Sequence, residues 1–326
     1  MVTPFCARGQ PAGGTLTATL ANHGLAGAKL ERRYGNHLLV PVTINNRRGA
    51  LMIDTGSPIT LIDRNSVNTF GLTVEKTDSS VGGLFGRAWE RYGMSKVKSI
   101  AMGNCMVTNV PVAIADLSGM NPDRNTAATG SHLSDSKTMA HVNGVLGSRE
   151  MVKFGMIIDC TRQMLYINPN GASSAVSQTL ASFLAGHGFT KIPMRLNANN
   201  HFDVEGALNG HATRFIVDTG SATTLIDTQV AVKSGTGVTA LASYGAGGAG
   251  NLVEGVNRTG VKEMAIGNFK LANAEVVVAH VSGDILLSKS TAESNAGVLG
   301  QDYLATNFAV IDMGGKTLYL RRPDSR

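Results

Sequence analysis

The residues best suited to chemistry in this sequence lie in two identical tetrapeptides. Asp-Thr-Gly-Ser occurs at positions 54–57 and again at 218–221, and Thr-Leu-Ile-Asp follows each copy, at 60–63 and 224–227. An apolar run precedes each tetrapeptide, so a strand would deliver each carboxylate into a turn whose glycine permits close approach of the backbone. We expect the fold to bring the two aspartates face to face. The residues are Asp54, Thr55, Gly56, Ser57, Asp218, Thr219, Gly220 and Ser221.

Two carboxylates within hydrogen-bonding distance cannot both ionise without a large cost, so the pair holds one proton and titrates as a unit. The ionised partner can take a proton from a bound water while the protonated partner donates to a carbonyl oxygen. Such a pair hydrolyses an amide without a metal ion or a covalent intermediate. We therefore expect no cofactor and no metal.

The two tetrapeptides belong to an internal duplication. From about residue 15 the chain repeats itself at an offset of 164, which aligns Asn36-His37 with Asn200-His201, and the offset falls to 153 near the end. The first copy therefore carries about 11 extra residues, placed in the polar stretch 121–137, which we expect to be a surface loop. The flanking residues have diverged between the copies, whereas both tetrapeptides have not, which favours a function for the aspartates.

Each copy predicts a short helix followed by several strands. The helices are expected at 16–23 and 180–187, with His23 and His187 near the last carbonyls, and apolar, β-branched runs predict the strands. The predicted fold class is all-β, with two similar lobes. The expected strands are 38–44, 110–115, 202–208 and 274–279, with hairpins at 154–167 and 308–320.

With these motifs in this order, the sequence resembles the aspartic peptidases of the pepsin and retropepsin group. Each lobe of that group supplies one Asp-Thr/Ser-Gly turn, and a later apolar-apolar-Gly segment completes a ψ-shaped loop, for which 145–147 and 298–300 stand at the right places. The resemblance implies two homologous ψ-loop β-barrel lobes with a cleft between them. It further implies a single-chain, tandem retropepsin-like endopeptidase of bacterial type, monomeric, which cleaves a peptide or protein by a water held between Asp54 and Asp218.

The resemblance also implies roles for the other turn residues. Thr55 and Thr219 would join the two turns by hydrogen bonds, and the two glycines would place backbone groups near the scissile carbonyl. The hydroxyls of Ser57 and Ser221 would bond the outer carboxylate oxygens, which favours the ionised dyad and an acidic working range.

Members of the group close a hairpin flap over the substrate, and two Gly-rich segments suggest two flaps here. Phe85 and Trp89 are the nearby aromatic residues, although no tyrosine stands in a Tyr-Gly-Thr setting. Ile59, with Leu84 and Phe85, implies apolar pockets beside the scissile bond. The expected flap residues are Gly83, Leu84, Phe85, Gly86, Trp89, Gly247 and Gly248.

The length of 326 residues fits two domains. The predicted organisation is a disordered arm at 1–14, an N-terminal lobe at 15–169, a linker at 170–178 and a C-terminal lobe at 179–326. The net charge is +6, but the basic residues are scattered, so no nucleic-acid partner is expected. No apolar stretch is long enough to span a membrane.

The three cysteines match no zinc pattern, and Cys105 and Cys160 lie next to strand-like apolar runs, so we expect buried free thiols rather than a disulfide. We expect a periplasmic or secreted enzyme, although no signal peptide is visible.

Several other interpretations stay open. A non-catalytic peptide-binding module would keep both lobes without the activity, and a processing enzyme with one substrate would show the same motifs. The stretch 245–250 fits a dinucleotide-binding pattern, but the glycines at 255 and 260 break the helix that this pattern needs. His132 and His141 lie in or beside the long loop, where solvated side chains are more common than metal ligands.

Overall fold

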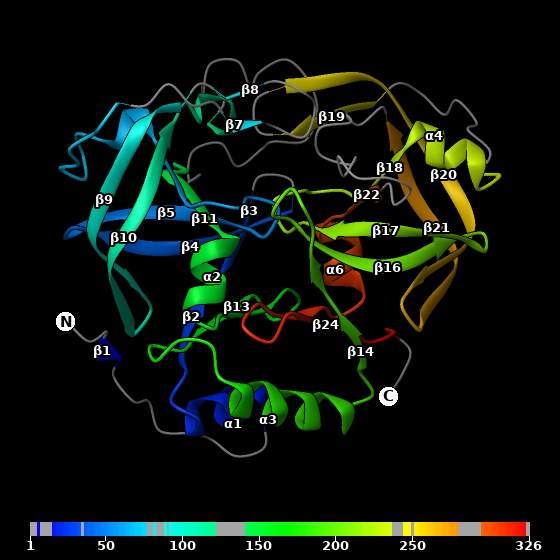
Figure 1. Cartoon of the computed structure of the whole chain (residues 1–326), viewed down its shortest axis with the longest axis horizontal. Coiled ribbons are helices and arrows are strands. Elements are labelled where there is room, and N and C mark those ends of the chain that lie inside the picture. The colour runs from blue at the N-terminus through cyan, green and yellow to red at the C-terminus, as the bar shows by residue number, and fades with distance from the viewer. Residues whose placement is uncertain are drawn as a thin grey trace.

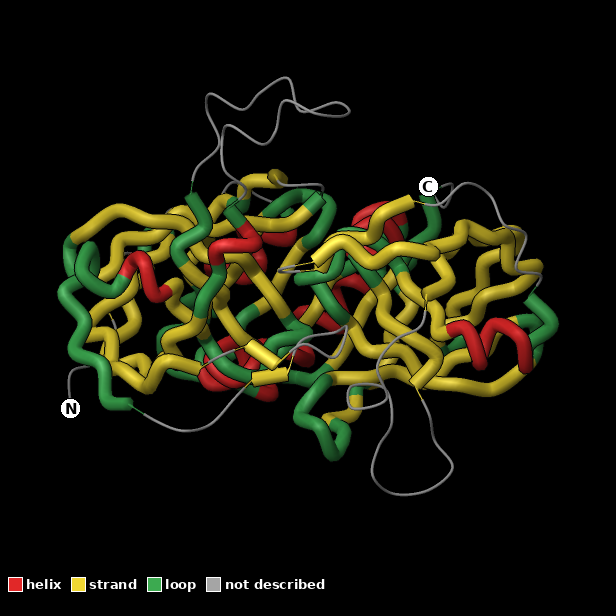
Figure 2. The backbone as a smooth tube through the Cα atoms, turned by 90° about the horizontal axis from the view of Figure 1, so that it is seen from above, coloured by secondary structure: helices red, strands yellow, loops and turns green. Residues whose placement is uncertain are grey.

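The computed structural model describes residues 5–6, 15–33, 36–76, 81–82, 88–89, 91–121, 141–236, 244–248, 251–279 and 295–323. Its elements form two similar lobes, which lie side by side in Figure 1 and are seen from above in Figure 2. The prediction of an all-β fold with two homologous lobes is confirmed.

The first lobe contains the elements of the first copy and the short strand that precedes it. Its elements are β1 (Phe5–Cys6), α1 (Leu16–Asn22), β2 (Ala26–Lys29), β3 (Glu31–Arg33), β4 (His37–Ile44), β5 (Arg47–Asp54), β6 (Leu61–Asp63), β7 (Val81–Gly82), β8 (Ala88–Trp89), β9 (Arg91–Met102), β10 (Cys105–Ala115), β11 (Gly144–Gly147), α2 (Ser148–Lys153), β12 (Ile157–Asp159) and β13 (Met164–Ile167). Short 3₁₀ helices lie at Arg64–Ser66 and Ser118–Met120.

The second lobe repeats this order. Its elements are α3 (Ser174–Ala185), β14 (Thr190–Pro193), β15 (Arg195–Leu196), β16 (Phe202–Leu208), β17 (His211–Val217), β18 (Leu225–Asp227), α4 (Thr228–Lys233), β19 (Tyr244–Gly248), β20 (Asn251–Ile266), β21 (Phe269–Ala279), β22 (Asn295–Leu299), α6 (Gln301–Thr306), β23 (Val310–Asp312) and β24 (Thr317–Leu320).

Each lobe closes its main sheet into a barrel. In the first lobe the pairings run β10-β6-β11-β5-β4, and β9 pairs with both β10 and β4, which closes the ring. In the second lobe the pairings run β16-β17-β22-β18-β21-β20, and β20 returns to β16. Closure leaves the strands of the ring without free edges, which secures the strands that carry the aspartates.

A six-stranded sheet joins the two lobes, in the order β14-β24-β23-β12-β13-β2. Its central pairing is between lobes, with Ile158 of β12 opposite Ile311 of β23. The hairpins expected at the end of each copy are present, but they pair with each other across the lobes. The main hydrophobic core accordingly contains buried residues of both lobes, such as Ile158 and Ile311.

Helices α1 and α3 pack together beside this sheet, at the bottom of Figure 1. Helix α3 begins at Ser174, because the hydroxyl of Ser173 accepts the N–H of Val176, so the helix occupies most of the segment predicted to be a linker. His187 bonds the carbonyl of Phe183 in the last turn of α3, whereas the ring of His23 contacts Thr179.

Two predictions about the first residues and the cysteines need correction. Phe5–Cys6 form β1 and pair with β10, so part of the segment predicted to be a disordered arm lies in a sheet. The register places Cys6 opposite Cys105, and Cys105 is disulfide-bonded rather than a free thiol. Local apolar sequence could not reveal this, because the pairing joins distant segments. Cys160 is a buried free thiol, as expected.

In the part of the chain that the structure describes, no helix has both the length and the apolar character that crossing a bilayer would require.

Candidate active site

The two Asp-Thr-Gly turns lie at the ends of equivalent strands, one in each lobe. Asp54 is the last residue of β5, and β11 runs parallel to it with Gly147 opposite Asp54. Asp218 follows β17, which pairs in parallel with β22, and its N–H donates to the carbonyl of Leu299 at 3.1 Å. The two apolar-apolar-Gly segments thus lie directly beside the aspartates.

Hydrogen bonds between the threonines join the two turns across the lobes. The N–H of Thr55 donates to the hydroxyl of Thr219, and the N–H of Thr219 donates to that of Thr55, both at 3.0 Å. Each hydroxyl in turn donates to a carbonyl of the opposite strand, Thr55 to Val217 at 2.7 Å and Thr219 to Ile53 at 2.8 Å. Both side chains are buried, so water cannot replace these bonds.

This arrangement brings the carboxyls of Asp54 and Asp218 together. They share a hydrogen bond, and a methyl group on Gly56 would come within 2.5 Å of Oδ1 of Asp218. A methyl group on Gly220 would collide with Asp54 in the same way, so only glycine fits at either position.

The pKa of both carboxyls lies above the ordinary value. Burial, the charge of Asp218 and the bond to it hold the pKa of Asp54 well above its usual range. Burial also raises the pKa of Asp218, but the hydrogen bond from Asp54, the N–H of Gly220 and the charge of His201 act against it. The pair therefore retains a proton well above the pH at which an isolated aspartate loses it.

The serines after the glycines do not bond the carboxylates through their hydroxyls, so that prediction is wrong. The hydroxyl of Ser57 donates to the carbonyl of Ile59, and that of Ser221 donates to Thr223, both at 2.8 Å. A hydroxyl has one proton, and each closes a local turn with it. Backbone groups serve the carboxylates instead, with Ser57 N–H at 3.0 Å from Asp54 Oδ1 and Gly220 N–H at 2.9 Å from Asp218 Oδ1.

Four polar residues near the dyad were not identified from the sequence. Gln301 donates to the carbonyl of Thr219 at 3.4 Å, and Arg32 of the first lobe donates to Gln301 Oε1 at 3.2 Å. His37 and His201 begin or precede the strands that pair with the two aspartate strands. The retained Asn-His pair in both copies was a signal for the histidines, whereas Arg32 and Gln301 lack counterparts in the other copy.

Most of the expected flap residues lie outside the part of the chain that the structure describes. Positions 83–86, with Gly83, Leu84, Phe85 and Gly86, are not among the described residues. The backbone at Trp89 belongs to β8, which pairs with β7, and Gly247 and Gly248 belong to β19, which pairs with β20. Both hairpins lie at the end of the molecule opposite α1 and α3 (Figure 1).

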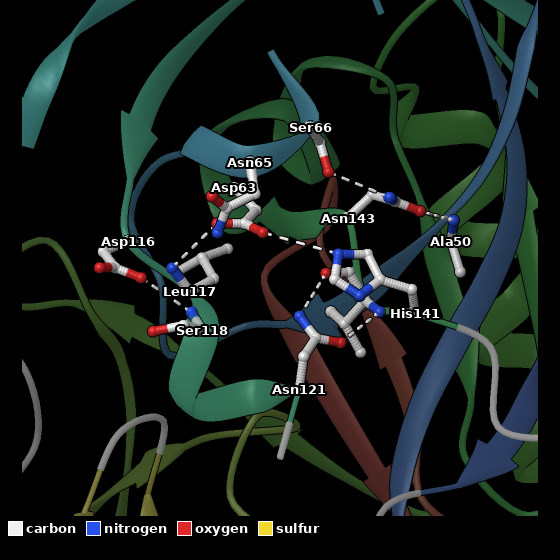
Figure 3. A network of polar contacts seen from close by, with 11 residues as sticks. Ala50, Asp63, Asn65, Ser66, Asp116, Leu117, Ser118, Asn121, His141 and Asn143 are labelled. Carbon is white, nitrogen blue, oxygen red and sulfur yellow. Dashed lines mark hydrogen bonds and ion pairs between the residues drawn. The ribbon is translucent and has the colours of Figure 1, made fainter. Parts of the chain in front are cut away.

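A polar network supports the first lobe beside the aspartate strand (Figure 3). The Asn143 side chain accepts the N–H of Ala50 in β5 and donates to the hydroxyl of Ser66, both at 3.0 Å. Buried Asp63 accepts the N–H of Leu117 at 3.2 Å, and His141 Nε2 lies 3.6 Å from its Oδ2. Within the described ranges, no three His, Cys, Asp or Glu side chains gather as a metal site requires.

Comparisons with known proteins agree with this geometry. The model of the aspartyl protease family matches residues 40–148 and 204–303, one match in each lobe. A search among curated proteins finds no match.

Three solved structures are similar to this chain to different extents. The aspartic proteinase from Irpex lacteus is 12% identical with a TM-score of 0.53, covering 92% of this chain and 98% of that one. Basic 7S globulin from soybean is 10% identical with a TM-score of 0.45, covering 91% and 94%. A retropepsin-like aspartic protease from Rickettsia conorii is 15% identical with a TM-score of 0.28, covering 44% and 90%. At these identities the structures report on the fold alone, and it is the match of the family model over most of both lobes that shows that this chain belongs to the aspartyl protease family.

Proposed function

We propose that this protein is an aspartic endopeptidase that hydrolyses peptide bonds with a water activated between Asp54 and Asp218. The observation that carries the proposal is the pair of buried carboxyls, which lie under turns held together by reciprocal threonine bonds and which raise each other's tendency to keep a proton. The ionised carboxylate takes a proton from the water, whose oxygen bonds to the scissile carbonyl carbon, while the protonated carboxyl donates to the carbonyl oxygen.

Collapse of the resulting diol completes the reaction. The carboxyl that took the water proton gives it to the departing amide nitrogen, the C–N bond breaks, and a diol hydroxyl returns its proton to the other carboxylate. The dyad ends in its starting protonation state, so one site serves many turnovers without a cofactor.

The substrate we propose is an extended peptide, bound by one chain acting as a monomer because both aspartates come from the same polypeptide. Ile59, two residues beyond Ser57, packs against the apolar cluster that includes Leu61 and Val145, which supports an apolar pocket on the side of the first lobe. The disulfide at Cys105 supports a periplasmic or secreted location, because disulfides persist in oxidising compartments.

The test is peptide cleavage by the wild-type protein, Asp54→Asn and Asp218→Asn between pH 3 and pH 8, with a mixed peptide library read by mass spectrometry. Because the retained proton depends on both carboxyls, each variant should lose cleavage by about 10⁴-fold or more. Arg162→Gln is a matched surface control, since its guanidinium pairs with Asp159 and not with the dyad, and it should cleave normally.

Cleavage that survives in both asparagine variants would contradict the proposal. A folded wild-type protein that binds peptides but cleaves none at any pH would instead support the peptide-binding module.

A further inference from the structure

The two lobes place a histidine at the same position next to each aspartate. The pairing of Leu39 with Met52, continued by two residues, sets His37 opposite Asp54, and the pairing of Asp203 with Ile216 sets His201 opposite Asp218 in the same way. Nδ1 of each ring is buried without a hydrogen-bond partner. The duplication thus gave both aspartates the same neighbour.

His201 makes contact with both turns of the dyad. The backbone carbonyl of Gly56 in the opposite lobe faces this ring and favours its protonated form. The carboxyls of Asp218 and Asp203 are the two charged groups that face the ring. A proton gained by this ring would therefore lie between two carboxylates.

Asp203 is fixed by its own partners. Arg214 donates to its Oδ1 through Nε at 2.9 Å, and Nε of Arg195 lies 3.8 Å from the same oxygen. Arg214 also donates to Glu205 at 3.2 Å. With the negative charge of Asp203 offset by two guanidinium groups, Asp218 is the carboxylate that His201 affects most.

The first lobe has no equivalent of Asp203 and Arg214. When the two copies are aligned with an offset of 164 residues, Leu39 corresponds to Asp203 and Ala50 corresponds to Arg214. Both Leu39 and Ala50 are buried in an apolar cluster. Burial lowers the pKa of His37, with no aspartate acting against it, whereas Asp218 and Asp203 oppose the same effect of burial on the pKa of His201.

We propose that His201 is a positioning residue that makes the two aspartates unequal, holding the negative charge of the dyad on Asp218 and leaving the shared proton on Asp54. Its meaning for catalysis rests on the proposed function, in which Asp218 then takes the proton of the water and Asp54 donates to the carbonyl oxygen.

The first experiment does not need proteolysis. The protein is labelled with ¹³C-histidine, and the pKa of His201 and His37 is followed by NMR in the wild type and in Asp218→Asn. Loss of an opposite charge at close range should lower the pKa of His201 by about one unit. The pKa of His37, in the same spectra, should not fall with it, because the aspartate opposite His37 is Asp54, which this variant keeps. Equal shifts of both rings, or no shift of His201, would overturn the proposal.

The second experiment compares His201→Gln with its matched control, His37→Gln. Glutamine retains an N–H donor for Gly56 but cannot carry the charge. Without that charge Asp218 ionises at higher pH, so the acidic limb of the kcat/KM profile should move up by about one pH unit in His201→Gln. It should stay in place in His37→Gln.

The two experiments separate the two proposals. An absence of cleavage in the wild type would defeat the proposed function, while the NMR titration would still decide the role of His201. If kcat of His201→Gln fell by the same factor at every pH, with both limbs of the pH profile unchanged, His201 would have a structural role only and the inference would be overturned.

Discussion

At the scale of single residues, the site is a balance between burial and hydrogen bonding. The two carboxyls lose water, which raises their pKa, while the N–H groups of Ser57 and Gly220 favour their ionised forms. The serine hydroxyls contribute nothing to this balance, since they donate to local carbonyls. Activity should therefore reach a higher pH than hydroxyl-supported carboxylates would allow.

The same balance predicts how stability depends on pH. Between the ordinary pKa of aspartate and the raised pKa of Asp54, the folded protein keeps a proton that the unfolded chain has lost. The free energy of unfolding therefore falls as pH rises through this window, by about 1.4 kcal/mol for each unit of raised pKa. Asp54→Asn stays neutral, so it should be more stable than the wild type at pH 7 and lose that advantage near pH 3.

Urea unfolding at both pH values measures this difference. Asp116→Asn is a control of opposite sign, because Ser118 and Arg64 lower the pKa of Asp116, and its replacement should remove stability at pH 7. Equal stability of Asp54→Asn and the wild type at pH 7 would show that folding does not raise the pKa of Asp54.

At the scale of elements, the strand beside each aspartate ends in a glycine that packs directly on the loop after the Asp-Thr-Gly turn. No larger residue fits at this glycine. Gly147 of β11 lies opposite Asp54, and a methyl group there would collide with the backbone of Ile59 and come within 2.8 Å of the nitrogen of Thr60. Gly300 meets Thr223 and Thr224 in the same way in the other lobe. The loop after each Asp-Thr-Gly turn therefore packs directly on the segment that completes it.

Gly147→Ala should lower the free energy of unfolding by about 3 kcal/mol and reduce kcat, because the added methyl group displaces the loop beside Asp54. Gly260→Ala is the matched control: a methyl group at this strand position meets nothing, and the change should be below about 0.5 kcal/mol. Chemical denaturation together with peptide cleavage measures both effects. Similar losses in the two variants would refute the close approach as the cause.

The sequence predicted the elements better than their partners. Strong local patterns marked the turns at Asp54 and Asp218 and the strands around them, because apolar runs and glycine act within a few residues. The pairing of β12 with β23 and the disulfide at Cys105 depend on segments far apart, which leave no local signal. The role of His201 was hidden for the same reason, since the groups that it contacts lie in the other turn and in a buried ion pair.

At the scale of the whole molecule, the two lobes are joined more closely than a simple duplication suggests. The six-stranded sheet takes strands from both, and the main core is continuous through it. The N-terminal helix α1 packs on α3 of the second lobe. The dyad lies on the same junction, so its geometry depends on the association of the lobes and not on either lobe alone.

This continuity predicts the behaviour of an isolated first lobe. A chain ending at Asn170 keeps its closed barrel but exposes the β12 edge that Ile311 and its neighbours cover, and it loses the threonine partners of Thr55. An uncovered apolar edge strand favours association, so this fragment should form dimers or aggregates rather than a stable monomer.

Co-expression of this fragment with residues 171–326 should restore a one-to-one complex and, with it, peptide cleavage. Sedimentation velocity and thermal unfolding monitored by circular dichroism measure both states. A monomeric fragment that unfolds cooperatively would mean that the first lobe folds independently. The shared sheet would then form between two lobes that are already folded.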